Sequence, residues 1–229
     1  MRFNELAWAG MLFYYRSFGD KRYSAVMGDR SFVERLRKAP AEISVREFEE
    51  KAILGLINVE NYDLLVSHRL AEKLLCRVIE QRNCTMALER LSLVDCDLGD
   101  QDTMDAINSL YLALYVEGLW ITGVSKIAHL LNERLLPPLN PDIAQRFGIL
   151  SQKSDLTPWL RAVQQEIQEA TRDFRIQGLG GMPEDFLSKK IGYSALGYTK
   201  SLVKFADEYH WIRYSDRLPL PPRWIPALS

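Results

Sequence analysis

Apolar residues recur at helical spacing along nearly the whole chain, and no convincing run alternates apolar with polar residues. The clearest amphipathic stripe covers residues 156–174, with Pro158 in its first turn. Shorter stripes mark helices around residues 71–78 and 107–114, and a long C-terminal helix is expected to run from Pro183 to Phe205. The pattern therefore predicts an all-α fold.

Length and composition are those of an ordinary globular protein. The chain has 229 residues, of which 47% are hydrophobic and 26% are charged, so it can bury a full core without disulfides or a structural metal. No apolar run is long enough for a membrane span. The short apolar stretch at the N-terminus is interrupted by Glu5 and Arg16 and lacks a cleavage site. A cytoplasmic protein without membrane contact is therefore expected.

Cysteine usage excludes several kinds of site. The three cysteines, Cys76, Cys84 and Cys96, form no C-x-x-C pair, so neither a disulfide framework nor a zinc site is indicated. They are too few for a four-cysteine iron–sulfur cluster. We expect buried apolar cysteines and no cofactor.

Aspartates cluster between residues 95 and 105, which invites a metal interpretation. The cluster does not fit a calcium loop, because Gly99 stands where an oxygen ligand is needed. Capping of the helix that begins near Asp102 is the favoured explanation, and no metal centre is expected.

Charge is distributed unevenly, although the net charge is only −1. Residues 1–40 hold eight Lys/Arg against four Asp/Glu, and residues 189–229 hold seven against three, so each end carries +4. The two ends form one basic face if they fold against each other, or they are simply solvated surfaces of uneven charge. The proline-rich tail is expected to run extended, with Trp224 and Ile225 as anchors.

The segment 103–149 carries the most informative motif. It reads as a helix, a turn at Gly118, a second helix through residues 125–132, a proline-marked loop, and a third helix that opens at Asn140. Ser125 and Asn140 are fifteen residues apart, and Asn140 and Gly148 are eight apart. This segment resembles the helix-hairpin-helix (HhH-GPD) DNA glycosylase superfamily, and the resemblance implies that superfamily's helical fold.

The resemblance implies that the hairpin contacts a DNA phosphate through backbone N–H groups and the start of the second helix. In this chain the first glycine of the hairpin is Gly118, while Trp120 occupies the second glycine position and obstructs a close backbone approach. Gly123, Ser125 and Lys126 complete the candidate DNA-binding set. Lys126 contacts a phosphate in one interpretation and is a solvated surface lysine in the other.

The catalytic positions of the superfamily are altered. Thr122 stands where bifunctional members carry a Schiff-base lysine. Asn140 stands where the resemblance implies a catalytic aspartate that stabilises positive charge on the sugar. Asparagine caps a helix as well as aspartate does, so the structural role is kept and the charge is lost. Asp142 is the candidate replacement acid, although a first-turn carboxylate usually only complements the helix dipole.

Aromatic residues at the N-terminus supply further candidates. Tyr14 and Tyr15 are the choices for stacking on an extruded base, and core packing of the first helix is the alternative. His129 matches a histidine common in the resembling branch and is expected to pack near the hairpin without a catalytic role.

The domain prediction is a single helical domain, residues 1–229, with two interleaved lobes. One lobe contains the hairpin, at about residues 103–150, and the N- and C-terminal helices form the other. Three functions remain open: a DNA-binding protein that is catalytically impaired at Asn140, an active DNA N-glycosylase that uses Asp142, or a scaffold that binds protein partners. The first two imply duplex or damaged DNA as a partner.

Overall fold

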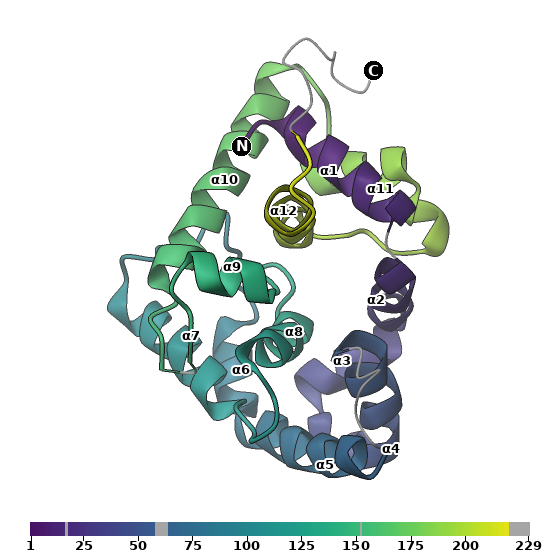
Figure 1. Cartoon of the computed structure of the whole chain (residues 1–229), viewed down its shortest axis with the longest axis vertical. Helices are drawn as coiled ribbons and strands as arrows, with labels where there is room; N and C mark the ends of the chain where they lie inside the picture. The colour runs from purple at the N-terminus through teal and green to yellow at the C-terminus, as the bar shows by residue number, and fades with distance from the viewer. Residues whose placement is uncertain (17, 58–63, 152, 220–229) are drawn as a thin grey trace.

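The computed structural model of the protein describes residues 1–16, 18–57, 64–151 and 153–219. Every regular element in these ranges is a helix and none is a strand, which confirms the predicted all-α class. Figure 1 shows two groups of helices, with the long helix α10 (Thr157–Ile176) running along one side from one group to the other.

The elements before residue 90 are α-helices joined by short 3₁₀ and π-helical segments. Their bounds are α1 (Phe3–Arg16), α2 (Phe18–Gly28), α3 (Arg30–Lys38), the 3₁₀ segment η1 (Pro40–Glu42), α4 (Val45–Phe48), the π-helix η2 (Glu49–Ile57), α5 (Leu64–Glu80) and α6 (Arg82–Leu88).

The later elements include the predicted hairpin. Apart from α10, their bounds are α7 (Gln101–Ala113), α8 (Ile121–Leu131), α9 (Pro141–Arg146), α11 (Pro183–Ile191), the 3₁₀ segment η3 (Tyr193–Leu196), α12 (Leu202–His210) and the π-helix η4 (Trp211–Ser215).

The upper group in Figure 1 contains α1, α11 and α12, and α1 packs against both partners and against α10. The predicted stripe on α10 is confirmed, because its apolar residues are buried. The ring of Phe3 lies 4.7 Å from that of Phe174 and 5.9 Å from that of Phe186, so aromatic contacts join α1, α10 and α11.

The lower group is built around α8, whose residues 123–125 and 127–131 are all buried. A helix that is apolar on nearly every side needs neighbours on every side. The helices α3 and α7 and the π-helix η2 provide them. The N-terminal helices are therefore divided. Helix α1 joins the C-terminal helices, whereas α2 to α5 pack with one another and with η2, and α3 and η2 contact α8.

The prediction of one long C-terminal helix from Pro183 is wrong. The chain turns twice, because Gly192 and Gly197 adopt positive φ angles of 105° and 71°, in the left-handed region that favours glycine. The helix is thereby split into α11 and α12 with η3 between them. The expected tail anchors Trp224 and Ile225 lie outside the described residues.

The cysteines are less buried than expected. Cys76 is exposed, which makes its predicted role as a buried filler wrong, and Cys84 and Cys96 are partly buried. Burial raises the pKa of the Cys96 thiol to about 11. In the aspartate cluster, Asp100 caps α7 by accepting a hydrogen bond from the Thr103 backbone nitrogen at 3.1 Å, as the capping interpretation expects.

None of the helices in the described ranges combines the length and the apolar character that crossing a bilayer demands. The two chain ends do fold against each other, since α1 packs on α12. Carboxylates neutralise part of their positive charge within the protein. The ion pairs include Arg2–Glu5, Arg16–Asp216, Arg35–Glu47, Lys200–Glu208 and Lys204–Asp207.

Candidate functional site

The second hairpin helix, α8, and the segment that leads into α9 lie side by side. The hydroxyl of Ser125 on α8 accepts a hydrogen bond from the Leu139 backbone nitrogen at 2.8 Å and donates to the Thr122 carbonyl at 2.8 Å. Ser125 is fully buried by this contact. The sequence motif therefore corresponds to a real juxtaposition of two segments in space.

Asn140 caps α9, as the sequence indicates. Its Oδ1 accepts a hydrogen bond from the Ile143 backbone nitrogen at 2.9 Å, and Pro141 occupies the first helical turn. Its Nδ2 is buried and has no hydrogen-bond partner among the described residues. The side chain therefore keeps two N–H donors for a group outside the protein.

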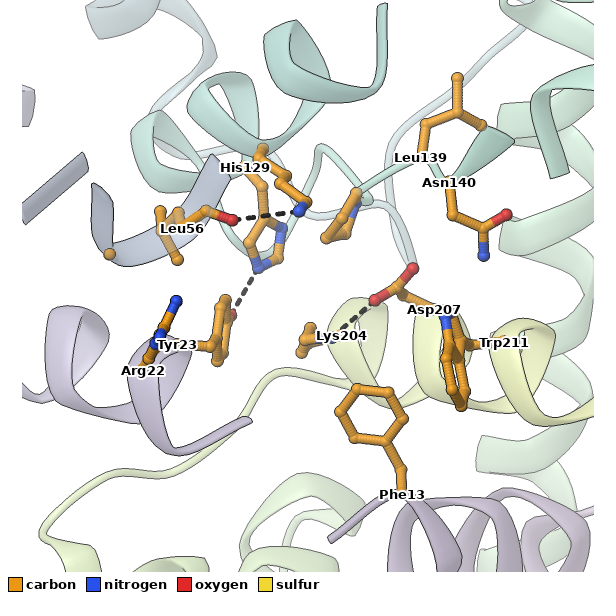
Figure 2. A pocket seen from close by; sticks show the side chains of 13 residues that line it. Phe13, Arg22, Tyr23, Leu56, His129, Leu139, Asn140, Lys204, Asp207 and Trp211 are labelled. Carbon is orange, nitrogen blue, oxygen red and sulfur yellow. Dashed lines mark hydrogen bonds and ion pairs between the residues drawn. The ribbon is translucent and has the colours of Figure 1, made fainter. Parts of the chain in front are cut away.

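A cavity of about 230 Å³ opens beside Asn140. One wall consists of α8 and residues 138–140, and the opposite walls come from α1, α2, η2, α12 and η4. In Figure 2 the amide of Asn140 faces the same space as Asp207 and Trp211. The cavity thus lies where the two groups of helices meet.

Aromatic rings line part of this cavity. Phe13 of α1 and Trp211 of η4 pack edge to face with their ring centroids 5.5 Å apart, and Tyr23 of α2 lines another side. Trp211 lies in a π-helical segment and Leu56 in another, and such widened turns are frequent at functional sites. Rings of this kind offer flat apolar surface to a planar ligand.

Three basic side chains and one carboxylate also line the cavity. Arg22, which is exposed, lies at the edge, and Lys126 and Lys204 lie deeper. Lys204 Nζ pairs with Asp207 Oδ2 at 2.6 Å. Lys204 Nζ also lies 3.6 Å from Glu208 Oε1, so carboxylates of the protein balance its charge. Arg22 is the basic side chain at the edge that suits a ligand with negative charge.

His129 is fixed in one neutral form. Its Nδ1 lies 2.6 Å from the Leu136 carbonyl, which can only accept, so Nδ1 carries the proton. Its Nε2 then accepts a hydrogen bond from the Tyr23 hydroxyl at 2.6 Å. Burial lowers the pKa of His129 to about 3, against an opposing effect of the Leu136 carbonyl. His129 therefore holds Tyr23 in place, as expected for a packed histidine near the hairpin.

The candidate DNA-binding residues divide into exposed and buried ones. Gly118 is exposed with a φ of +89°, and Trp120 is 77% exposed. Gly123 and Ser125 are buried, so neither offers a surface to a phosphate in this conformation. Lys126 is not the solvated surface lysine of one interpretation, since its Nζ donates to the Leu56 carbonyl at 3.0 Å and lines the cavity.

The other candidates lie apart from the cavity. Asp142 is exposed and does not line it. Tyr14 packs against Tyr193 with ring centroids 5.1 Å apart, and Tyr15 is 82% exposed. Neither tyrosine lines the cavity, where the N-terminal helices instead contribute Phe13 and Tyr23. Of the predicted catalytic and base-stacking residues, Asn140 is the one that faces this space.

The sequence interpretation missed the contribution of the C-terminal region. Lys204, Asp207 and Trp211 all line the cavity from α12 and η4. A signal was present, because Lys204 and Asp207 are charged residues one turn apart on a largely buried helix. Charged side chains on a buried helix need partners or a function.

Comparisons of this chain with protein-family models, with curated proteins and with solved structures find no match.

Proposed function

We propose that the protein binds nucleic acid and accepts a single extruded base in the cavity beside Asn140. The proposal rests on the resemblance of the hairpin segment to the helix-hairpin-helix DNA glycosylase superfamily and on the chemistry of the cavity. One fold can host many functions, so the residues that line the cavity decide what it binds.

The amide of Asn140 is the observation that carries the proposal. Its Oδ1 is engaged in capping α9, and its buried Nδ2 has no partner among the described residues. Nucleobases carry carbonyl oxygens and ring nitrogens that accept hydrogen bonds from such an amide. The ring of Phe13 or of Trp211 supplies a flat surface on which a base stacks, since the two rings are nearly perpendicular to each other. Arg22 lies at the edge of the cavity for a phosphate.

The free-energy cost of extruding a base predicts which duplexes bind most tightly. Flipping a base out of a duplex costs a few kcal/mol and costs least where the base is mismatched or unpaired. We therefore expect a duplex with one unpaired base to bind more tightly than a fully paired duplex of the same length. Both affinities should fall steeply with salt, because phosphates are neutralised on binding.

Replacing Asn140 with serine is expected to weaken binding of the unpaired-base duplex about tenfold, which corresponds to the loss of one good hydrogen bond. Serine keeps the cap of α9, so the free energy of unfolding should change little. Fluorescence anisotropy of labelled duplexes measures the affinity, and thermal unfolding checks the fold.

The matched control is Asp142→Asn, which changes an exposed residue of the same helix outside the cavity. This variant should bind like the original protein. If no duplex binds even at low salt, the nucleic-acid proposal is wrong and the protein-scaffold alternative gains.

An active N-glycosylase is a second candidate, favoured by the position of Asp207. This carboxylate lines the cavity, whereas Asp142 does not, so Asp207 is the acid available to a ligand there. In such a reaction the oxygen of water bonds to the sugar C1′, the C1′–N bond breaks, and a proton from water ends on the departing base. Asp207 would stabilise the developing positive charge on the sugar and relay that proton from the water to the base.

This candidate predicts release of free base from a panel of damaged duplexes, measured by chromatography. Asp207→Asn should abolish the release, and Asp142→Asn should leave it unchanged. A gain of activity in Asn140→Asp would indicate that the original protein binds without excising. Release that depends on Asp142 but not on Asp207 would contradict this assignment.

A further inference from the structure

Lys126 presents an unusual amine to the cavity. It lies in the middle of α8, and its Nζ donates a hydrogen bond to the Leu56 carbonyl, a neutral acceptor, at 3.0 Å. Within the described residues no carboxylate oxygen lies within ion-pairing distance of this amine. Lys204 in the same cavity differs, because it pairs with Asp207 at 2.6 Å.

The surroundings of Lys126 make its charged form less favourable than it is in water. Burial lowers the pKa of its ammonium group, Lys204 lowers it further, and Asp207 opposes both effects. The hydrogen bond to Leu56 needs only one N–H, so a neutral amine keeps that contact and has a lone pair left over. A desolvated lysine of this kind is a nucleophile towards carbonyl carbon.

We propose that Lys126 forms an imine with a small aldehyde or 2-oxo acid that carries a negative charge. A cavity of about 230 Å³ is smaller than the roughly 300–1,000 Å³ of drug-sized pockets, so the ligand is small. Arg22 supplies positive charge for its anionic group, and Pro138 and Leu139 contribute apolar lining.

The chemistry balances without an oxidant or reductant. The lone pair of Lys126 Nζ attacks the carbonyl carbon while the C=O electron pair moves to oxygen, and a proton passes from nitrogen to that oxygen. Loss of one water molecule then leaves a C=N bond. Asp207 is the carboxylate in the cavity that can shuttle these protons. The other titratable groups that line this space are Arg22 and Tyr23 of α2, His129 of α8 and Lys204 of α12.

Imine formation by Lys126 does not require nucleic acid, so its test is independent of the proposed function. The test incubates the full chain at neutral pH with glyoxylate and cyanoborohydride, which delivers hydride to the imine carbon while nitrogen takes a proton from solvent. Peptide mass spectrometry then locates the carboxymethylated lysines. Lys126 should be labelled at least about tenfold faster than the exposed Lys73, because the cavity holds the aldehyde beside the amine.

Propionaldehyde, which lacks the charge, should show a much weaker preference for Lys126. Lys126→Arg keeps a donor for Leu56 but cannot form an imine, so labelling of the cavity should disappear, whereas Lys73→Arg should not affect it. The comparison of Lys126 with Lys73 in the unaltered protein tests the proposal even if a variant fails to fold. Equal or faster labelling of Lys73, or no preference for glyoxylate over propionaldehyde, would overturn the proposal.

Discussion

Replacing Glu208 with glutamine is expected to lower the free energy of unfolding by about 3–5 kcal/mol, because it leaves a buried ammonium group without its carboxylate. Glu208 Oε1 lies 2.5 Å from Lys200 Nζ, and both side chains have no exposed surface. The ammonium also lies 3.4 Å from the centroid of the Tyr193 ring. That cation–π contact is worth about 2 kcal/mol for a desolvated ammonium, which is less than the expected cost of losing the carboxylate.

Replacing the other member of the pair, Lys200→Met, should lower the free energy of unfolding by a smaller amount. Glu208 Oε1 also lies 3.6 Å from Lys204 Nζ, so a second cation remains near the carboxylate when Lys200 is lost. The double variant Lys200→Met with Glu208→Gln should be more stable than Glu208→Gln alone, since no buried charge is then left unpaired.

Chemical denaturation of the three variants measures these differences. The matched control is Glu34→Gln, which breaks the exposed pair of Glu34 with Lys38 and should have little effect. A Glu208→Gln variant as stable as the Glu34→Gln variant would show that the buried pair does not hold α12 in place.

The helical class could be predicted because it depends on local spacing. The stripe on α10 and the cap at Asn140 are short-range features, and both are present in the structure. The break between α11 and α12 was missed because apolar spacing continues across it, while the two turns depend on the positive φ angles of Gly192 and Gly197. The sequence alone does not reveal the backbone conformation of a glycine inside an apolar stripe.

The site could be predicted only in part, because it is assembled from segments far apart in the chain. Asn140 and Lys126 were accessible through the hairpin motif. Phe13 and Asp207 lie almost two hundred residues apart in sequence, and they line the same cavity only because α1 packs on α12. Tertiary packing sets which face of α1 lies against the other helices. The sequence alone therefore could not show that Phe13, rather than its neighbour Tyr14, lines the cavity.

Acid is expected to destabilise the protein through His129 before most carboxylates titrate. The folded protein holds the His129 pKa at about 3, below the ordinary value of 6.5, because the ring is buried and neutral. As the pH falls below 6.5, the unfolded chain therefore binds a proton at His129, whereas the folded protein does not. Stability contributed by the neutral ring is complete above pH 6.5 and is lost as the pH falls from there towards 3.

The expected slope is about 1.4 kcal/mol per pH unit for one proton, which adds up to several kcal/mol across the window. Unfolding free energies measured by denaturant titration between pH 7 and pH 5 isolate this effect, because carboxylates with lowered pKa values, such as Asp29 and Glu47, lose their contribution only in stronger acid. His129→Asn should flatten the slope whatever its cost at pH 7, and His68→Asn, at an exposed position, should preserve it. An unchanged slope in His129→Asn would mean that the ring is protonated in the folded protein, and the hydrogen bond from Tyr23 to Nε2 would then have to be reassigned.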